Sequence, residues 1–579
     1  MMRPVSSSFP SRPTPDVLGR VSFICLLSAA LFGGCAPSEP EALPTSRFTR
    51  SPHGVVSAAH PLAAQAGADM LELGGNAVDA AVAAAFVLAV VEPSMSGLGG
   101  RTQILIRLPD GRYEGIDGTT QAPASYDPDT ALEASYGYGV VGIPGTPAAL
   151  LKAHANHGVL PRAVLMAAAI RLAEEGHALL PGEAGRRAAV AAELAEFEGS
   201  KAHFLKEDGT THQAGEVFRQ PALARTLRAL EDYGADTFYE GPLAEIMARE
   251  IQANGGQVTL ESLAAYRAED ARVVTGDYRG HELVGLWLPS YGAITIEILN
   301  LLESVDAGAI PDASWALALS EAIRVAYLDR AAQEDWEDAE RLTSEEWADE
   351  RDDLMRLEER GAGGPVAEDG APASALPSDE DGHTTHLTVA DVEGMVVALT
   401  QSLGPNMGSR VASPELGFLY AATLGGYLGR MEAGERARSH ISPFMVARDG
   451  APVLALGAAG GGRIPTAIAA VVSRVLDRGM TLEEALSAPR VVPEGGSSRV
   501  VGDPDGPRTA LLEVVPGQGF DDAVAGWFEA TGYSVEMVER SGAFGRVHAV
   551  RWHPEEGVWE GGADPDWEGA AVAPREVIR

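Results

Sequence analysis

The stretch TTHLTVA, residues 384–390, decides the fold. Its polar and apolar residues alternate, residues 391–394 (DVEG) have the composition of a turn, and residues 395–400 return as a second run, so the segment predicts a β-hairpin. The preceding residues 361–383 (GAGGPVAEDGAPASALPSDEDGH) consist mostly of glycine, alanine, proline and acids, and they cannot bury enough apolar surface to order themselves. The strongest internal boundary of the chain therefore lies between residues 383 and 384.

Thr384 is the first residue after that boundary, and its position allows a specific chemistry. A threonine hydroxyl is a weak nucleophile unless a base adjoins it, and the α-amine of an N-terminal threonine is such a base. The free α-amine has a pKa of about 7.7–8.0, which is close to ambient pH. This mechanism requires cleavage between His383 and Thr384. The residues alone leave a second interpretation open, an ordinary threonine on a strand.

A second hairpin and a glycine loop follow. Residues 443–447 and 452–456 flank the turn RDG, and GAAGGG (457–462) then leads into a predicted helix over 463–476. A strand that turns through glycines into a helix start leaves backbone N–H groups unpaired, which suits the binding of an oxyanion. Taken alone, the loop has a simpler explanation, because glycines also permit a tight strand-to-helix turn.

The chain before residue 361 is predicted to be largely helical. The run PLAAQAGADMLEL ends at two glycines and predicts a helix over 61–73. Asn76 can cap a second helix over 77–91, whose apolar residues cover every face and predict burial rather than a membrane span, given its length. Residues 143–360 show mostly helical periodicity and are interpreted as scaffold.

Composition excludes several classes of function. A chain of 579 residues predicts one very large unit or two interlocked layered units, and 45% hydrophobic with 22% charged residues is typical of a globular protein. The formal net charge of −38 argues against a nucleic-acid partner. There is no G-x-S-x-G elbow, no H-E-x-x-H motif and no phosphate-loop lysine, and the 13 histidines lack metal-ligand spacing. We expect neither a metal nor a cofactor.

The N-terminus has the pattern of an export signal. Arginines precede an apolar run at 21–32 that is too short to span a bilayer, and small residues lead to Cys35. We expect residues 1–35 to be a signal peptide with a lipoprotein-like cysteine, cleaved so that Cys35 becomes the acylated N-terminus. The protein would then be an exported, membrane-anchored lipoprotein with a linker over 36–53. A simple cleaved signal peptide, which would leave the protein periplasmic or secreted, is the alternative. Cys25 lies in the segment to be removed, so neither an internal disulfide nor cysteine catalysis is expected.

Several blocks resemble the γ-glutamyltranspeptidase family, and they occur in the family's order from about residue 54 to the C-terminus. The blocks are HPLAAQAGADMLELGGNAVDAAVAAAFVLAVVEPSMSGLGG (60–100), GIPGTPAAL (142–150), DYRGHELVGLWLPSYG (277–292), HTTHLTV (383–389) and GAAGGGRI (457–464). The resemblance implies an α+β fold, the four-layer αββα sandwich of N-terminal-nucleophile hydrolases. It also implies self-cleavage into a large chain (54–383) and a small chain (384–579) that stay together as a heterodimer.

The catalytic residues implied by the resemblance are all present. The family cleaves itself before the first threonine of its T-T-H motif, which matches Thr384. The family's oxyanion-binding glycine pair matches Gly460 and Gly461. Its second hydroxyl matches Ser402, a serine where threonine is common.

The substrate-binding residues implied by the resemblance are mostly replaced. The arginine that pairs with the α-carboxylate of a γ-glutamyl group falls on Thr119, and an asparagine falls on Gly404. The acid pair that holds the α-amino group falls on two glycines, at positions 425 and 426. Of two adjacent carboxylate-binding serines, Ser439 matches and the second is His440. Arg101 replaces a family glycine and is a candidate cation for the substrate.

The sequence therefore predicts an exported hydrolase or acyltransferase that acts on a small-molecule or peptide amide through a threonyl acyl-enzyme. Its acyl group is expected to differ from an unmodified γ-glutamyl group. Two alternatives remain open. One is a true glutathione or γ-glutamyl-peptide hydrolase, and the other is an inactive, lipid-anchored binding protein of the same fold.

Overall fold

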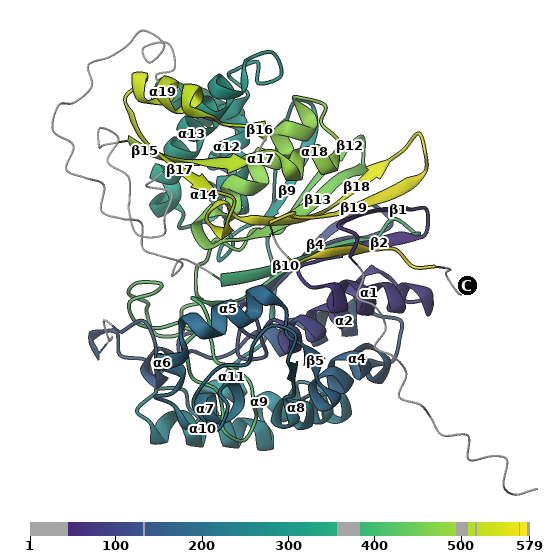
Figure 1. The fold of residues 1–579 in the computed structure, drawn as a ribbon, viewed down its shortest axis with the longest axis vertical. Coiled ribbons are helices and arrows are strands. Elements are labelled where there is room, and N and C mark those ends of the chain that lie inside the picture. The colour runs from purple at the N-terminus through teal and green to yellow at the C-terminus, as the bar shows by residue number, and fades with distance from the viewer. Residues whose placement is uncertain are drawn as a thin grey trace, which may run out of the picture. The chain divides into compact units, whose positions relative to one another are not determined.

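The computed structural model describes residues 45–130, 134–355, 383–493, 508–515, 518–566 and 568–575. The predicted signal, Cys35 and nearly all of the predicted pre-cleavage segment lie outside these ranges. The described part of the chain from Pro44 onward forms a single compact unit. Its backbone builds two large sheets that are stacked face to face, with helices on both outer sides (Figure 1).

Each large sheet has seven strands and combines segments from before and after residue 384. The first sheet has the order β20 (Ala570–Val572), β2 (Gly54–Ala58), β10 (His383–Asp391), β11 (Val396–Gly404), β3 (Arg101–Arg107), β4 (Tyr113–Gly118), β7 (Glu269–Ala271). The second has the order β1 (Phe48–Ser51), β19 (Val558–Ala563), β18 (Arg546–His553), β13 (Ala451–Ala459), β12 (Phe444–Arg448), β9 (His281–Leu286), β8 (Val273–Tyr278). All neighbouring pairs are antiparallel.

Three apolar layers hold this stack together. Between the sheets, Leu105 and Val396 from one sheet pack in a cluster with Met445, Val550 and Trp559 from the other. The outer face of the first sheet is covered by helices that include α1 (Pro61–Glu72), α2 (Ala77–Val91), α3 (Thr146–His157), α4 (Arg162–Glu175) and α8 (Pro221–Tyr233). The outer face of the second is covered by α12 (Gly292–Leu302), α13 (Asp312–Leu328) and α17 (Ile464–Leu476). The predicted αββα sandwich is thereby confirmed.

Smaller elements complete the helical layers and the periphery. The remaining helices are α5 (Pro181–Ala189), α6 (Ala191–Leu194), α7 (Glu198–Phe204), α9 (Asp236–Tyr239), α10 (Pro242–Ala253), α11 (Leu260–Ala265), α14 (Trp336–Leu342), α15 (Glu345–Asp352), α18 (Leu482–Ser487) and α19 (Asp522–Ala530). The remaining strands are β5 (His177–Ala178), β6 (Val217–Phe218), β14 (Val491–Pro493), β15 (Arg508–Val515), β16 (Gln518–Gly519) and β17 (Tyr533–Glu539). None of the helices in the described ranges is both long and apolar enough to cross a membrane.

The predicted helices and hairpins are confirmed within one or a few residues. The Asn76 side chain accepts from the N–H groups of Val78 and Asp79, and the Asp79 carboxylate accepts from the N–H of Asn76. The two residues therefore form a capping box at the start of α2. Every residue of α2 is buried, as its continuous apolar surface predicted. The helix packs between α1 and α4 beneath the first sheet.

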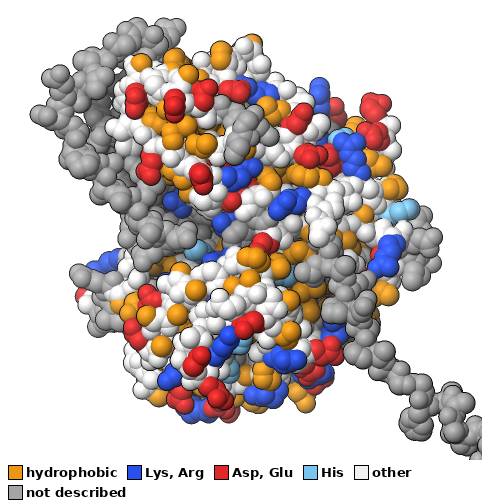
Figure 2. Space-filling model, in the orientation of Figure 1, with side chains coloured by type: hydrophobic (Ala, Val, Ile, Leu, Met, Phe, Trp, Pro, Cys, Tyr) orange, Lys and Arg blue, Asp and Glu red, His pale blue; other side chains and the backbone are white. Residues whose placement is uncertain are grey.

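The predicted linker over 36–53 is wrong in its second half. Residues Phe48–Ser51 form strand β1, which pairs with β19 more than 500 residues later in the sequence. A four-residue strand is stable only when such a distant partner pairs with it, and local sequence does not reveal that partner. On the face shown in Figure 2, acidic side chains stand among basic and apolar ones.

Candidate active site

Thr384 lies in the middle of the first sheet, near the N-terminal end of β10. This strand pairs with β2 on one side and β11 on the other, which fixes its backbone on both edges. The register shifts between His383 and Thr384, so an irregularity of the strand falls on the predicted cleavage point. Such irregularities re-aim side chains locally. Thr384 itself is only 3% exposed.

Ser402 connects Thr384 to the peptide bond that precedes it. Thr384 and Ser402 are paired directly across β10 and β11, and Thr384 Oγ1 donates to Ser402 Oγ at 3.1 Å. Ser402 Oγ donates in turn to the carbonyl oxygen of His383 at 2.9 Å and accepts from the N–H of Gly404 at 2.9 Å. The predicted second hydroxyl therefore contacts both the nucleophile and the carbonyl that self-cleavage would attack.

The predicted glycine loop is shorter than its sequence suggested, because β13 continues to Ala459. Gly460 (φ 139°) and Gly461 (φ 58°) make the turn into a short 3-10 helix, η4 (Gly461–Arg463), that continues into α17. The N–H groups at a helix start have no acceptor within the helix. Gly461 lines the same cavity as Thr384, so its backbone faces the nucleophile's surroundings.

Glycine is required at position 457 for close packing behind the nucleophile strand. A Cβ there would lie 2.3 Å from the ring of His386, which lies on β10 directly after Thr385. His386 is fully buried between the hydroxyls of Thr400 (2.7 Å) and Thr388 (2.9 Å). Burial holds the pKa of His386 well below its ordinary value, so this imidazole is neutral.

A buried ionic cluster supports the other side of β10. Thr385 Oγ1 donates to a carboxylate oxygen of Glu92 at 2.9 Å. Arg186 on α5 lies 3.5 Å from Glu92 and 3.1 Å from Glu183. Sequence reasoning missed this cluster, because its members are far apart in the chain and none belongs to a catalytic motif.

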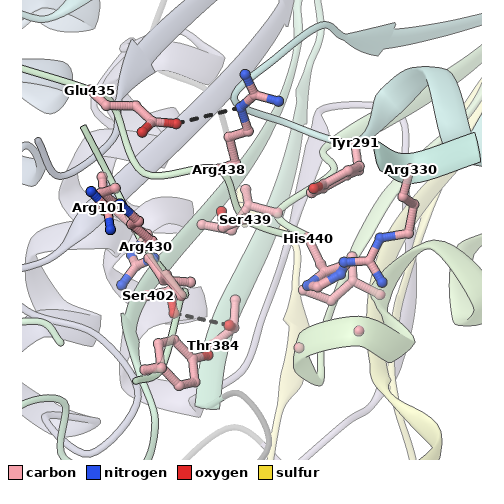
Figure 3. Close-up of a pocket in the computed structure, with 17 residues that line it drawn as sticks. Arg101, Tyr291, Arg330, Thr384, Ser402, Arg430, Glu435, Arg438, Ser439 and His440 are labelled. Carbon is pink, nitrogen blue, oxygen red and sulfur yellow. Dashed lines mark hydrogen bonds and ion pairs between the residues drawn. The ribbon is translucent and has the colours of Figure 1, made fainter. Parts of the chain in front are cut away.

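A cavity of about 320 Å³ opens over Thr384 (Figure 3). Its lining contains four arginines and one glutamate. The residues that line it are Arg101, Tyr291, Arg330, Thr384, Ser402, Tyr427, Leu428, Arg430, Met431, Glu435, Arg438, Ser439, His440, Ile441, Gly461, Gly462 and Ile464. The cavity thus combines the predicted nucleophile with a positive lining.

Arg101 is the most buried of these cations. It pairs with Ser402 across β3 and β11, is 1% exposed, and donates from Nη2 to the carbonyl oxygen of Ala422 at 2.6 Å. Its Nε has no acceptor, and no carboxylate within the described ranges forms an ion pair with it. Burial lowers the pKa of Arg101 to about 10, and the group stays charged near neutral pH.

Gly404 makes room for Arg101. A Cβ at this position would lie 3.1 Å from Arg101 Nη2 and 2.9 Å from the ring of Tyr427, and the glycine has a φ of 94°. The two differences from the family pattern, an arginine at 101 and a glycine at 404, therefore occupy the same space. A larger residue at 404 would displace the guanidinium.

Ser439 and His440 also lie where the sequence predicted them, in the cavity wall. Ser439 Oγ and His440 Nε2 are both buried and have no hydrogen-bond partner among the described residues. The His440 ring stacks on Tyr291 with 5.1 Å between ring centroids. Burial, and then the nearby charge of Arg330, hold the pKa of His440 well below its ordinary value, so the ring is neutral.

Four of the positions that lack the family's binding residues, Thr119 and the glycines at 404, 425 and 426, are not among the residues that line the cavity. Thr119 is fully buried, and its hydroxyl is engaged with Asp117 and with Gln103 Nε2 at 2.9 Å. Asp117 is itself paired with Arg436 at 2.9 Å. The glycines at 425 and 426 are followed by Tyr427 and Leu428, which do line the cavity.

Sequence reasoning missed Arg330, Tyr291 and Arg438. Arg330 and Tyr291 belong to residues 143–360, which the helical periodicity identified only as scaffold. Arg330 lies in the 3-10 helix η3 (Asp329–Ala332) directly after α13. Periodicity describes which face of a helix is buried, and it does not show which residue after the helix end reaches a cavity.

Comparison with known proteins identifies the family. The model of the family described as gamma-glutamyltranspeptidase matches residues 63–573. The glutathione hydrolase proenzyme of Escherichia coli (strain K12) is 32% identical over 521 residues, covering 82% of this chain and 88% of the relative. The acylase ACY 1 proenzyme of Pseudomonas sp. (strain V22) is 33% identical over 550 residues, covering 90% and 93%.

A solved structure agrees with these relatives. The crystal structure of cephalosporin acylase from Bacillus halodurans superposes with a TM-score of 0.79 at 27% identity, covering 93% of this chain and 99% of that chain. The family match covers most strands of both sheets and the helices of both outer layers, and it begins after β1 and β2. The chain belongs to the γ-glutamyltranspeptidase family, and it is an enzyme of the N-terminal-nucleophile type that hydrolyses or transfers acyl groups.

Proposed function

We propose that the enzyme cleaves itself before Thr384 and then hydrolyses monoamides of dicarboxylic acids through an acyl ester of Thr384. The observation that carries the acyl specificity is Arg101, a buried cation beside Ser402 that has no carboxylate partner in the described part of the chain. A buried charge without a partner is costly, and an anionic acyl end would supply the missing partner.

Self-cleavage begins in the uncut chain. Thr384 Oγ1 attacks the carbonyl carbon of His383, and the negative charge that develops on the carbonyl oxygen is stabilised by the hydroxyl of Ser402, which already donates to it at 2.9 Å. The carbon–nitrogen bond breaks and the nitrogen takes up the proton from the threonine hydroxyl. Water then hydrolyses the ester, which leaves a carboxylate on His383 and a free α-amine on Thr384.

The processed enzyme repeats this chemistry on its substrate. The α-amine accepts the proton of Thr384 Oγ1 as the oxygen attacks the amide carbonyl. We expect the backbone N–H groups of Gly460 and Gly461 to donate to the resulting oxyanion. The amine leaves with the proton, and water attacks the ester to release the acid and restore the threonine.

The charges in the cavity favour an acid without an α-amino group. Four arginines face a single Glu435, and that glutamate lies 3.7 Å from Arg438. Arg430 is paired with Asp129 and Arg438 with Glu435, so an ammonium group would enter a lining that keeps two uncompensated positive charges, Arg101 and Arg330. A γ-glutamyl group without its α-amino group is a glutaryl group, which keeps a carboxylate for Arg101. A charge-assisted hydrogen bond of this kind contributes about 1.5–3 kcal/mol.

Both kinds of relative bear on this proposal. The Pseudomonas relative named acylase and the solved cephalosporin acylase support an acyl group other than γ-glutamyl. The relative named glutathione hydrolase supports the second candidate, hydrolysis of γ-glutamyl peptides. We favour the first, because Glu435, the one acid among the described lining residues, is already paired with Arg438. The intact contacts of Thr384 and Ser402 do not favour an inactive binding protein.

A set of three chromogenic amides tests the acyl specificity. The 4-nitroanilides of glutaric acid, butyric acid and L-glutamic acid (through its γ-carboxyl) share one leaving group and differ only at the acyl end. We expect kcat/KM on processed enzyme to be highest for glutaryl and lowest for γ-glutamyl, because this ratio compares transition-state binding directly. A strong preference for the γ-glutamyl compound would overturn the acyl specificity and leave the nucleophile assignment in place.

Location is a separate proposal that rests on sequence alone. We propose that the protein is exported and anchored to a membrane through acylated Cys35. The apolar run at 21–32, followed by small residues and a cysteine, supports it.

A further inference from the structure

Arg330 is a second cation of the cavity that has no acid partner. Arg430 is paired with Asp129 at 2.9 Å, and Arg438 with Glu435 at 3.7 Å. Arg101 and Arg330 form no ion pair with any carboxylate that the structure describes, and the Nε of each is buried without an acceptor. One unpaired arginine accounts for one anionic group of a ligand, so the second indicates a second anionic group.

The position of Arg330 is fixed by aromatic rings and not by charge. Its guanidinium lies 5.2 Å from the ring centroid of Tyr291 and 5.0 Å from that of Tyr327. The Tyr327 hydroxyl donates to the carbonyl oxygen of Gly462, directly beside the turn that faces Thr384. The neighbouring His440 has a lowered pKa and adds no further positive charge beside Arg330. Aromatic faces orient a guanidinium and leave its N–H donors available.

The two unpaired arginines lie on opposite sides of the nucleophile. In the close-up view Arg101 and Arg330 are at opposite ends of the cavity, with Thr384 between them (Figure 3). They also come from different layers, since Arg101 begins β3 of the first sheet and Arg330 follows α13 above the second. The acyl chain and the amine of a planar trans amide extend in opposite directions from the carbonyl carbon. An acyl end held by Arg101 therefore directs the amine toward Arg330.

We propose that Arg330 binds a carboxylate on the amine side of the scissile bond. The substrate class is then a dianion, a dicarboxylic acid joined by an amide to an amine that itself carries a carboxylate, such as an amino acid. This inference rests on the proposed function for the direction of the acyl chain. It adds a requirement on the leaving group, which the proposed function leaves open.

Two amides with the same acyl group and different amines test the inference. N-glutaryl-4-nitroaniline has a neutral leaving group, and N-glutaryl-5-amino-2-nitrobenzoate has the same nitroaniline with a carboxylate. We expect wild-type processed enzyme to prefer the carboxylated amide in kcat/KM. Arg330→Gln should reduce the ratio of the two kcat/KM values by roughly 10- to 100-fold, the range of a charge-assisted contact, because the carboxylated amide should lose far more than the neutral one. Arg330→Lys, which keeps the charge, should restore part of the ratio.

Matched controls separate this inference from the proposed function. Arg101→Gln should lower both glutaryl amides equally, because it acts on the acyl end. If glutaryl amides are not hydrolysed, the proposed acyl group is wrong, and the same pair of amines on whichever acyl group is accepted still tests Arg330. An equal loss on both amides in Arg330→Gln, or a wild-type enzyme that does not prefer the carboxylated amide, would overturn the inference.

A measurement on the wild-type enzyme covers the case in which the Arg330 variants do not fold or do not self-process. Free 5-amino-2-nitrobenzoate and 4-nitroaniline are the two leaving groups, and each can be tested as a competitive inhibitor. We expect the carboxylated amine to inhibit at roughly 10-fold lower concentration or better. Equal inhibition by the two amines would overturn the inference without any variant.

Discussion

The catalytic end of the cavity matches the family pattern, whereas the substrate-binding walls depart from it. At the catalytic end, Thr384, Ser402 and the turn at Gly460 and Gly461 all match the family pattern, and their positions depend on sheet register and backbone conformation. In the walls, Arg101 stands where the family pattern has a glycine and His440 where it has a serine. The glycines at 404, 425 and 426 stand where the family pattern has polar groups. Side chains that point into a cavity can be exchanged without moving a strand, whereas the nucleophile cannot move by one residue without leaving its face of the sheet.

The differences from the family pattern at positions 101 and 404 are coupled, because they affect the same part of the cavity wall. Loss of a side chain at Gly404 and gain of one at Arg101 fill one volume, so the packing of the site stays close to constant. What changes is the charge and its direction. We therefore expect substitutions in the walls to change the substrate preference and to leave the catalytic reaction intact. The predictions below test this expectation one residue at a time.

The largest effect is expected at the nucleophile. Thr384→Ala removes the hydroxyl that is proposed to attack the His383 carbonyl, so the chain should stay uncut on a denaturing gel. Activity on any amide should fall by roughly 10⁴-fold or more. Thr384→Ser keeps a hydroxyl and should still be cut, more slowly. A fully active preparation that remains a single uncut chain would contradict the mechanism.

Ser402 should show the next largest effect, and on cleavage as well as on turnover. Ser402→Ala removes the hydroxyl that donates to the His383 carbonyl, and loss of one such donor costs about 10²–10³ in rate. The rate of appearance of the two chains, followed by gel or mass spectrometry, measures it. Ser402→Thr keeps the hydroxyl and serves as the matched control. Equal defects in both variants would mean that the side chain acts through packing only.

Arg101 tests the difference between the walls and the catalytic end, because its substitution should change the acyl preference and leave the catalytic reaction intact. Arg101→Gln should lower kcat/KM for the glutaryl anilide by roughly 10- to 100-fold and change the butyryl anilide little. Arg107→Gln is the matched control, a buried arginine at the far end of the same strand that donates to carbonyl oxygens of Gly394 and Gly450. It should lower stability and leave the glutaryl-to-butyryl ratio unchanged. The same loss on both anilides in Arg101→Gln would place this residue with the catalytic group instead.

The smallest effect on catalysis is expected at Cys35. Cys35→Ser should move the protein from the membrane fraction to the soluble exported fraction and leave kcat/KM unchanged, since the residue precedes every element of the site. Mass spectrometry of the mature N-terminus checks the modification directly. A wild-type protein that is already soluble and begins elsewhere would remove the lipid anchor from the proposal.

The sequence predicted the local elements well and the assembled cavity only in part. Helices α1 and α2 and both hairpins were predictable, because caps, turns and periodicity are encoded within a few residues. Thr384, Ser402, Arg101, Ser439 and His440 were found through motifs and do line one cavity. Arg330 and the Glu92 cluster were not found, because each acts through residues that only the tertiary fold brings close. Strand β1 was missed for the same reason.

The interleaving of the two sheets has a consequence for the life of the molecule after cleavage. In the first sheet β2 from the large chain lies between β20 and β10 from the small chain, and in the second β19 from the small chain joins β1 to the rest. The two products cannot separate without breaking both sheets, so dissociation and unfolding become one event. Folding occurs once, as a unimolecular reaction of the precursor, but refolding of the cut enzyme is a bimolecular encounter of two incomplete chains. If the chain is cut before Thr384 as proposed, the mature enzyme would therefore persist by slow unfolding, and its lifetime would be set by a rate rather than by an equilibrium.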